Sequence, residues 1–143
     1  MTSTDTYLRK GTPAYRSASI ALFACGFATF ALLYCVQPLL PLFLKAFGVD
    51  AAGSSWVVSA ATIGVAVSLI PIGIASDRLG RKSLMAASQL LVASLTLAVA
   101  VMPSWKGILV LRFLSGVALS GVPAVAMAYL AEEVEPQSLG SVM

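Results

Sequence analysis

The sequence contains no histidine, only two cysteines and few charged residues, and these shortages together exclude several classes of function. Without histidine it has no metal-ligand cluster, and it has no phosphate-binding loop and no nucleophile with a base in reach. We therefore expect neither enzymatic activity nor a metal or cofactor. Charged residues make up 10% of the chain and hydrophobic residues 59%, with a mean hydropathy of +0.93, which is far from the composition of a soluble domain.

Long runs without charge divide the chain, and each is long enough to cross a hydrocarbon core, which needs about 20 apolar residues. We predict four transmembrane helices over residues 17–44, 54–76, 83–105 and 107–131. Residues 1–16 form a polar tail, residues 77–82 a short loop, and residues 132–143 an acidic end. The first run is too long for the apolar core of a signal peptide, so we expect it to be retained.

The basic residues follow the predicted topology. The tail and the 77–82 loop together carry six Lys or Arg residues, whereas the opposite side has only Lys45 and Lys106 outside the spans. The positive-inside rule then places the N-terminus and the loop in the cytoplasm. This distribution also argues against a nucleic-acid partner, despite the net charge of +3.

The loop has an unusual arrangement of charges. Asp77 follows the second span directly, at the helix end that already carries partial negative charge, so a nearby group must compensate it. Arg78, Arg81 and Lys82 lie within the same turn. Gly80 suits the last position of a type I turn.

Polar side chains inside the first and fourth spans indicate a functional interior. Gln37 lies three residues after Tyr34, toward the end of a long apolar run. An amide in hydrocarbon is costly unless it is paired or hydrated. Pro38 is expected to bend the first helix there. Arg112 enters the fourth span, where it faces a cavity or extends to the interface, and it could share a hydrated pocket with Gln37. In the third span Gln89 is the one strongly polar side chain, and we predict packing or lipid-facing surface there.

Small residues recur once per helical turn in the second and fourth spans and predict close helix packing. They are Ala60, Gly64 and Ser68 in the second span and Gly116, Ser120, Ala124 and Ala128 in the fourth, where Gly121 is a further packing candidate. The fourth-span series reaches Glu132, which either pairs with the basic loop or belongs to a solvated acidic end.

These residues resemble a known family. Gly73, Asp77, Arg78, Gly80, Arg81 and Lys82 fit the pattern G-x-x-x-D-R-x-G-R-K, which is similar to the signature between the second and third helices of the major facilitator superfamily. The spacing of Arg112, Gly116 and Gly121 resembles the fourth-helix motif of its proton-coupled efflux members. The run 34–41 resembles the first helix of its bacterial drug and sugar efflux permeases.

The resemblance implies a fold and a set of roles. The fold would be an all-α membrane protein, part of the N-terminal half of a superfamily transporter, located in the cell inner membrane. Gly73, Asp77, Arg78, Gly80, Arg81, Lys82 and Glu132 would form a conformational latch, with Arg81 paired to Glu132 and Asp77 docked on a helix of the second half. Arg112 would act in substrate or proton coupling, with Gln37 and Tyr34 near the cavity.

The same resemblance implies that the chain is incomplete. Superfamily transporters have two six-helix halves, so this chain would be the N-terminal fragment of an efflux permease, inactive alone, whose partners are the missing C-terminal helices, a small-molecule substrate, a proton gradient and the bilayer. No acid lies in 17–44, and Leu139 stands where many members have a basic residue. Two alternatives are a self-standing four-helix dimer like small multidrug-resistance transporters, which carry an acid in their first helix, and a non-transporting membrane assembly or regulatory protein.

Overall fold

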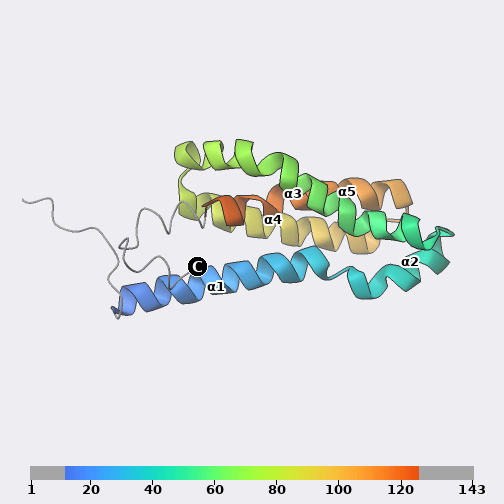
Figure 1. Ribbon diagram of the computed structural model, residues 1–143, viewed down its shortest axis with the longest axis horizontal. Helices are drawn as coiled ribbons and strands as arrows, with labels where there is room; N and C mark the ends of the chain where they lie inside the picture. The colour runs from blue at the N-terminus through green and yellow to red at the C-terminus, as the bar shows by residue number, and fades with distance from the viewer. Residues whose placement is uncertain (1–11, 126–143) are drawn as a thin grey trace, which may run out of the picture.

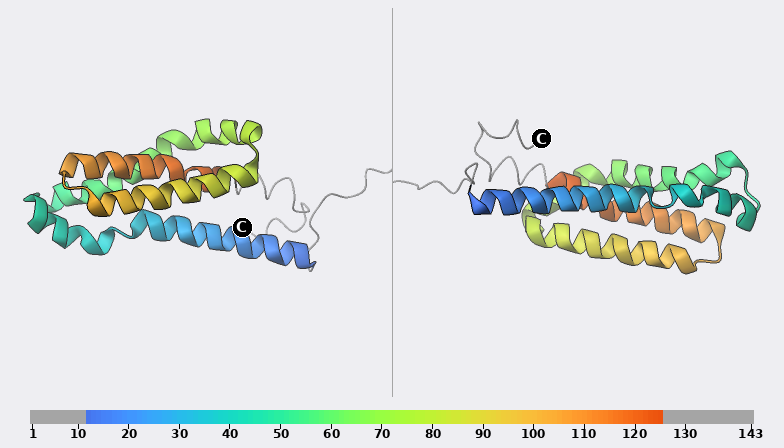
Figure 2. Two further views of the ribbon diagram at one scale, coloured as in Figure 1. Left: turned by 180° about the vertical axis from the view of Figure 1, so that it is seen from behind. Right: turned by 90° about the horizontal axis from the view of Figure 1, so that it is seen from below.

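The computed structural model describes residues 12–125, except for the side chains of Ala14, Tyr15, Ala18, Asp77, Arg78, Leu79 and Arg81. Its elements are α1 (Pro13–Tyr34), the short 3-10 helix η1 (Gln37–Leu39), α2 (Leu40–Phe47), α3 (Ala51–Leu79), α4 (Arg81–Val101) and α5 (Trp105–Leu119). A further helical turn covers residues 121–125. The helices α3, α4 and α5 lie side by side, α1 runs along the outside of this group, and α2 lies at one end (Figures 1 and 2).

Four stretches are long and apolar enough to cross a membrane, namely Ser19–Phe47, Ala51–Ser76, Lys82–Val101 and Trp105–Val125. The predicted all-α membrane fold is therefore confirmed. The helix limits differ from the predicted ones for local reasons. Residues 13–16, predicted to be tail, belong to α1, where Pro13 takes the first helical position that proline favours. The predicted third span, 83–105, ends earlier because Met102 precedes Pro103 and is extended, with φ −79° and ψ 118°.

The first span is not one continuous helix. It stops at Tyr34, passes through η1, and resumes at Leu40 as α2, which runs beyond the predicted end at residue 44. Pro38 has no N–H to donate to the carbonyl of Tyr34, so the regular hydrogen-bond ladder fails at this point. The predicted bend thus takes the form of a break within a membrane span.

The loop predicted over 77–82 is almost absent. Helix α3 begins after Asp50, whose carboxylate accepts a hydrogen bond from the Gly53 N–H at 2.6 Å, and continues to Leu79. Gly80 alone separates it from α4, with φ 82° and ψ 121°. The predicted type I turn is wrong, because helix occupies its central positions and the chain reverses at one positive-φ glycine instead.

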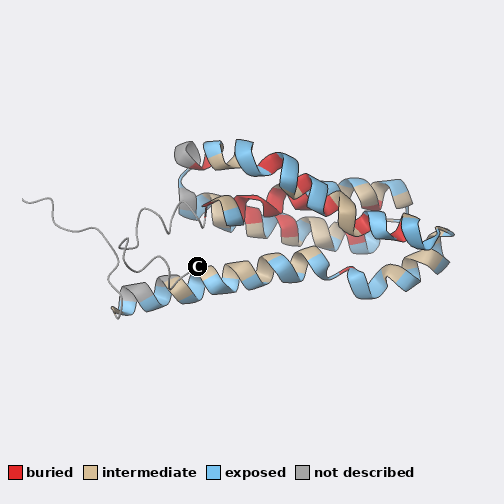
Figure 3. Ribbon diagram, viewed as in Figure 1, coloured by how far each residue is buried: buried red, intermediate tan, exposed pale blue. Residues whose placement is uncertain are grey.

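The core lies between α3 and α5, whose backbones touch. A Cβ at Gly64 would overlap the carbonyl oxygen of Phe113, and one at Gly116 would overlap that of Ala61. The hydroxyl of Ser68 donates to that of Ser120 at 3.0 Å. Buried residues cluster accordingly on these helices, whereas α1 is mostly exposed or half-buried (Figure 3). Small residues in both helices therefore allow the close approach that apolar packing in lipid requires.

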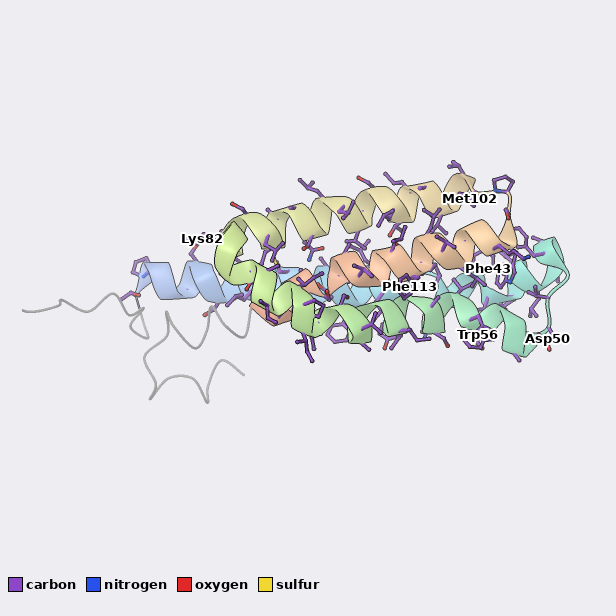
Figure 4. All side chains as sticks on the ribbon, turned by 90° about the horizontal axis from the view of Figure 1, so that it is seen from above. Phe43, Asp50, Trp56, Lys82, Met102 and Phe113 are labelled. Carbon is purple, nitrogen blue, oxygen red and sulfur yellow. The ribbon has the colours of Figure 1, made fainter. Side chains whose placement is uncertain are left out.

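The two ends of the bundle differ in chemistry. Asp50, Trp56 and Met102 lie at one end, and Lys82 lies at the other (Figure 4). At the first end the ring of Trp105 packs against Phe43 and Phe47, with ring centroids 5.9 and 5.5 Å apart. These contacts hold α2 against the start of α5, although the span that contains α2 is otherwise little buried.

Replacing Gly64 with Ala should separate α3 from α5, because the added methyl group meets backbone atoms that have no rotamer to change. We expect a loss of about 1–3 kcal/mol in the free energy of unfolding. Unfolding by sodium dodecyl sulfate, followed by circular dichroism in detergent micelles, measures it. Gly26→Ala is the matched control, since a Cβ added at Gly26 would have no neighbouring atom within 4 Å. Equal stability of both variants would contradict the close packing.

Candidate functional site

The side chain of Arg112 lies at the centre of the candidate site. It is seven residues into α5, or about 10 Å along the helix axis, and it has 0% of its surface exposed. Its Nε donates to the carbonyl oxygen of Val57 on α3 at 3.3 Å. Its Nη1 donates to the carbonyl of Leu32 at 3.3 Å, and its Nη2 donates to the carbonyl of Leu33. The guanidinium therefore joins three helices, α1, α3 and α5. Its predicted place at a cavity of the transporter stays a prediction.

The break in α1 explains why these carbonyls are available. The last four carbonyls of a helix have no N–H partner within it, and α1 ends at Tyr34, so Leu32 and Leu33 belong to this set. The same helix end carries partial negative charge, which favours a cation. The forked donors of a guanidinium can bind several acceptors at once. Arg112 thus caps this helix end within a membrane span, together with the Cys35 thiol, which donates to the Leu32 carbonyl at 3.2 Å.

The other predicted cavity residues lie just beyond this cap. Tyr34 is 41% exposed, and its ring stacks on Phe30 with centroids 6.3 Å apart. Gln37 is exposed at the start of η1. Among the described hydrogen bonds none joins Gln37 to Arg112, so their shared pocket stays a prediction. Both residues are nevertheless tied to Arg112 through the short segment whose carbonyls it binds.

The small residues of the last span face two neighbours. Besides Gly116 and Ser120 at α3, Gly121 lies against α4, where an added Cβ would overlap the hydroxyl of Ser88. Ala124 lies near Gly73, with its Cβ 3.9 Å from the place of a Cβ on that glycine. The second half of the last span therefore packs between α3 and α4, on the side of the turn that joins these two helices.

That turn is described mainly by its backbone. Asp77 lies in the last turn of α3, and Arg81 and Lys82 open α4 on the other side of Gly80. The side chains of Asp77, Arg78 and Arg81 are not described, and Glu132 lies outside the described residues. The latch and its Arg81–Glu132 pair therefore stay predictions.

Sequence reasoning missed the contact of Gln89, for which it predicts only a packing or lipid-facing surface. The Nε2 of Gln89 donates to the carbonyl of Cys25 at 3.1 Å and to the hydroxyl of Thr29 at 3.3 Å, both on α1. The cost of an unpaired amide in hydrocarbon is the signal that could have indicated a partner. Within residues 12–125, no group of three or more His, Cys, Asp or Glu side chains is placed to hold a metal.

A multi-pass helical protein with a broken span and a buried cation at membrane depth has the features of a membrane transporter. Residues 22–143 match the family model described as Major Facilitator Superfamily. The chain belongs to this superfamily.

Named relatives agree with that assignment. The chain is 51% identical over 138 residues to the uncharacterized MFS-type transporter YybF of Bacillus subtilis, covering 96% of this chain and 34% of the relative. It is 47% identical over 130 residues to the inner membrane transport protein YnfM of Escherichia coli, covering 91% and 31%. A more distant relative is the 4-hydroxybenzoate transporter PcaK of Pseudomonas putida, 34% identical over 104 residues, covering 72% and 23%. No solved structure matches the chain.

The comparisons define the protein at a coarse level. It is a multi-pass membrane protein of this superfamily. YybF and YnfM are both named as transporters, and YnfM is named as an inner membrane protein. The chain spans about a third of the length of YybF and of YnfM.

Replacing Arg112 with Met should destabilise the end of α1, because the carbonyl of Leu33 loses its donor inside the protein. We expect a loss of about 1–3 kcal/mol in the free energy of unfolding. Arg112→Lys should recover part of it, since one ammonium can bind one helix end but cannot bridge three helices. Detergent unfolding measures the series, with Lys106→Met, at an exposed position on the same helix, as control. If Arg112→Met is no less stable than this control, the capping role is wrong.

Proposed function

We propose that the chain is the N-terminal part of a secondary active transporter that exports a small molecule, such as a drug or sugar, in exchange for protons. The observation that carries this proposal is the buried cation at the break in α1. A charged side chain within a span costs about 3 kcal/mol or more on insertion scales, and residues that bear this cost usually serve transport.

The broken helix supports a role in substrate handling. Secondary transporters build their binding sites at discontinuous helices near the middle of the membrane, where backbone groups are free of the regular ladder. Here α1 stops at Tyr34, and the exposed Gln37 begins the next turn. Tyr34 and Gln37 would contact the substrate, while Arg112 would hold the helix end in place and respond to a change in charge nearby. Since residues 17–44 contain no acid, a proton-carrying carboxylate would lie in the remaining helices.

A second candidate is the transport of an aromatic acid. One relative is named as a 4-hydroxybenzoate transporter, and that substrate is an aromatic carboxylate. Tyr34 and its stacked neighbour Phe30 would suit an aromatic ring. A panel that contains drugs, sugars and aromatic acids separates the two candidates.

The chain alone should not transport, because a superfamily transporter works by movement of one half against the other. The test is a chimera in which this chain replaces the matching third of YybF, studied in everted membrane vesicles with a fluorescent probe of the proton gradient. Addition of a substrate should release part of the gradient in vesicles with the chimera, and the chain alone should give no response. The Arg112→Met chimera should lose at least 10-fold in rate, about the effect of 1.4 kcal/mol. No response of the chimera to any compound of the panel would argue against proton-coupled export.

The turn at Gly80 would act as a latch on the cytoplasmic side. Its charges oppose the helix dipoles, since Asp77 is at the C-terminal end of α3 and Arg81 and Lys82 are at the N-terminal end of α4. Each placement is locally unfavourable and would be relieved by partners elsewhere, Glu132 for Arg81 and a helix of the second half for Asp77. The six basic residues of the tail and turn favour a cytoplasmic location for both.

Two measurements check the latch. A cysteine introduced at Leu79 should react with an impermeant maleimide only from the cytoplasmic side, whereas one at Ser104, at the opposite end of the bundle, should react from outside. In the chimera, reversing the charge of Arg81 or of Glu132 alone should reduce transport, and reversing both should restore part of it. Labelling of Leu79→Cys from outside would overturn the orientation, and no rescue in the double variant would leave the two residues uncoupled.

A further inference from the structure

Helix α1 is held to the bundle by little apolar packing. In the span Ser19–Phe47, which contains α1, only 6% of the most apolar 18 residues are buried, against 56% in the span that contains α5. No described side chain of α1 itself is buried, and large ones such as Phe23 and Phe27 are 75% and 69% exposed. Figure 3 shows the same contrast between α1 and the other long helices. Leu32 and Leu33 at its end pack against the buried cluster of Val92, Ala118 and Leu119, and along the rest of α1 polar contacts contribute more to its position than interlocking apolar side chains.

Two polar side chains from neighbouring helices hold α1 at separate depths. Arg112 binds the carbonyls of Leu32 and Leu33 at its end, as described above. About two turns earlier, Gln89 of α4 uses its amide nitrogen for both Cys25 and Thr29. The hydroxyl of Thr29 itself donates to the Cys25 carbonyl at 2.8 Å. The amide of Gln89 thus meets two acceptors on one turn of α1.

The acceptor pair is specific to this turn. Along the face that meets Gln89, positions four residues apart are Ala21, Cys25, Thr29 and Leu33, and only Thr29 offers a hydroxyl. A slide of α1 by one turn, about 5.4 Å, would place a thiol or a leucine side chain against the amide. In lipid the amide would then lack one of its acceptors, with no water to replace it. A single buried polar residue fixes the register of coiled coils in the same physical way.

We propose that Gln89 is a positioning residue that sets the axial register of α1 through Cys25 and Thr29. Arg112 binds the C-terminal end of α1, and Gln89 fixes the position of the middle of α1 along its axis relative to α4. Because α1 leads directly to Tyr34 and Gln37, its register also sets where these two side chains lie. The consequence for transport rests on the proposed function, whereas the register itself does not.

Distances between spin labels test the register without any transport assay. The full chain, with Cys25→Ala and Cys35→Ser, is placed in lipid nanodiscs with one label pair on α1 and α4, at the exposed positions Ala24 and Ser94. A control pair on α3 and α5 occupies the exposed positions Val67 and Val110. Pulsed electron spin resonance gives the distance distribution of each pair.

Three substitutions give opposite expectations. Gln89→Met and Thr29→Val nearly keep the size of the side chain; the first removes both hydrogen bonds of Gln89, and the second removes the one to Thr29. Each should raise the population of displaced α1 by about 3- to 20-fold, the range of an interhelical hydrogen bond in a membrane. Thr29→Ser keeps the hydroxyl and should match the parent. The Gln89→Met and Thr29→Val double variant should be displaced no more than Gln89→Met alone. The control pair should not change.

Either of two results would overturn the proposal. One is an unchanged α1–α4 distribution in Gln89→Met. The other is an equal broadening of both label pairs, which would make Gln89 a general contributor to folding and not a positioning residue. Since no substrate is involved, neither result bears on whether the protein exports a small molecule, and failure of the transport assay would leave the register intact.

Discussion

The structure depends on the contact between the Arg112 guanidinium and the broken end of α1. A helix that stops inside a membrane leaves carbonyls without donors, and a cation inside a membrane lacks solvent. Each would be unfavourable alone, and each satisfies the other when they meet. The same contact ties the first span to the fourth, which are far apart in sequence. Removing either partner would leave the other uncompensated in a region where water cannot replace it.

The rest of the bundle makes this contact possible by two different kinds of packing. Between α3 and α5, glycines at positions 64 and 116 bring backbones into contact, so that Arg112 can reach the Val57 carbonyl on α3. Around α1 the packing is sparse, and hydrogen bonds from Gln89 and Arg112 replace it. The helices α3 and α5 are therefore closely packed, and α1 is packed more loosely against them.

The turn between α3 and α4 adds an electrostatic constraint at the opposite end from α2. A single glycine with positive φ joins two long helices, which leaves Asp77 and the basic residues on the unfavourable ends of the helix dipoles. A connection this short cannot rearrange to relieve them. In the proposed latch, partners in other parts of the transporter would relieve this placement.

The sequence by itself determined the class of protein, the four spans and a bend at Pro38, because apolar length and the missing N–H of proline act locally; that the bend is a break between α1 and α2 came from the structure. It also indicated Gly64, Gly116 and Ser120 as packing residues, since small side chains recur at helical spacing. Only the tertiary structure decided where Arg112 points, because the carbonyls of Leu32 and Leu33 are about 80 residues away along the chain. It likewise decided that Gln89 meets Cys25 and Thr29, some 60 residues distant. Backbone acceptors exist at every residue and leave no mark in the sequence, so the partners of a buried donor emerge only when the helices are packed.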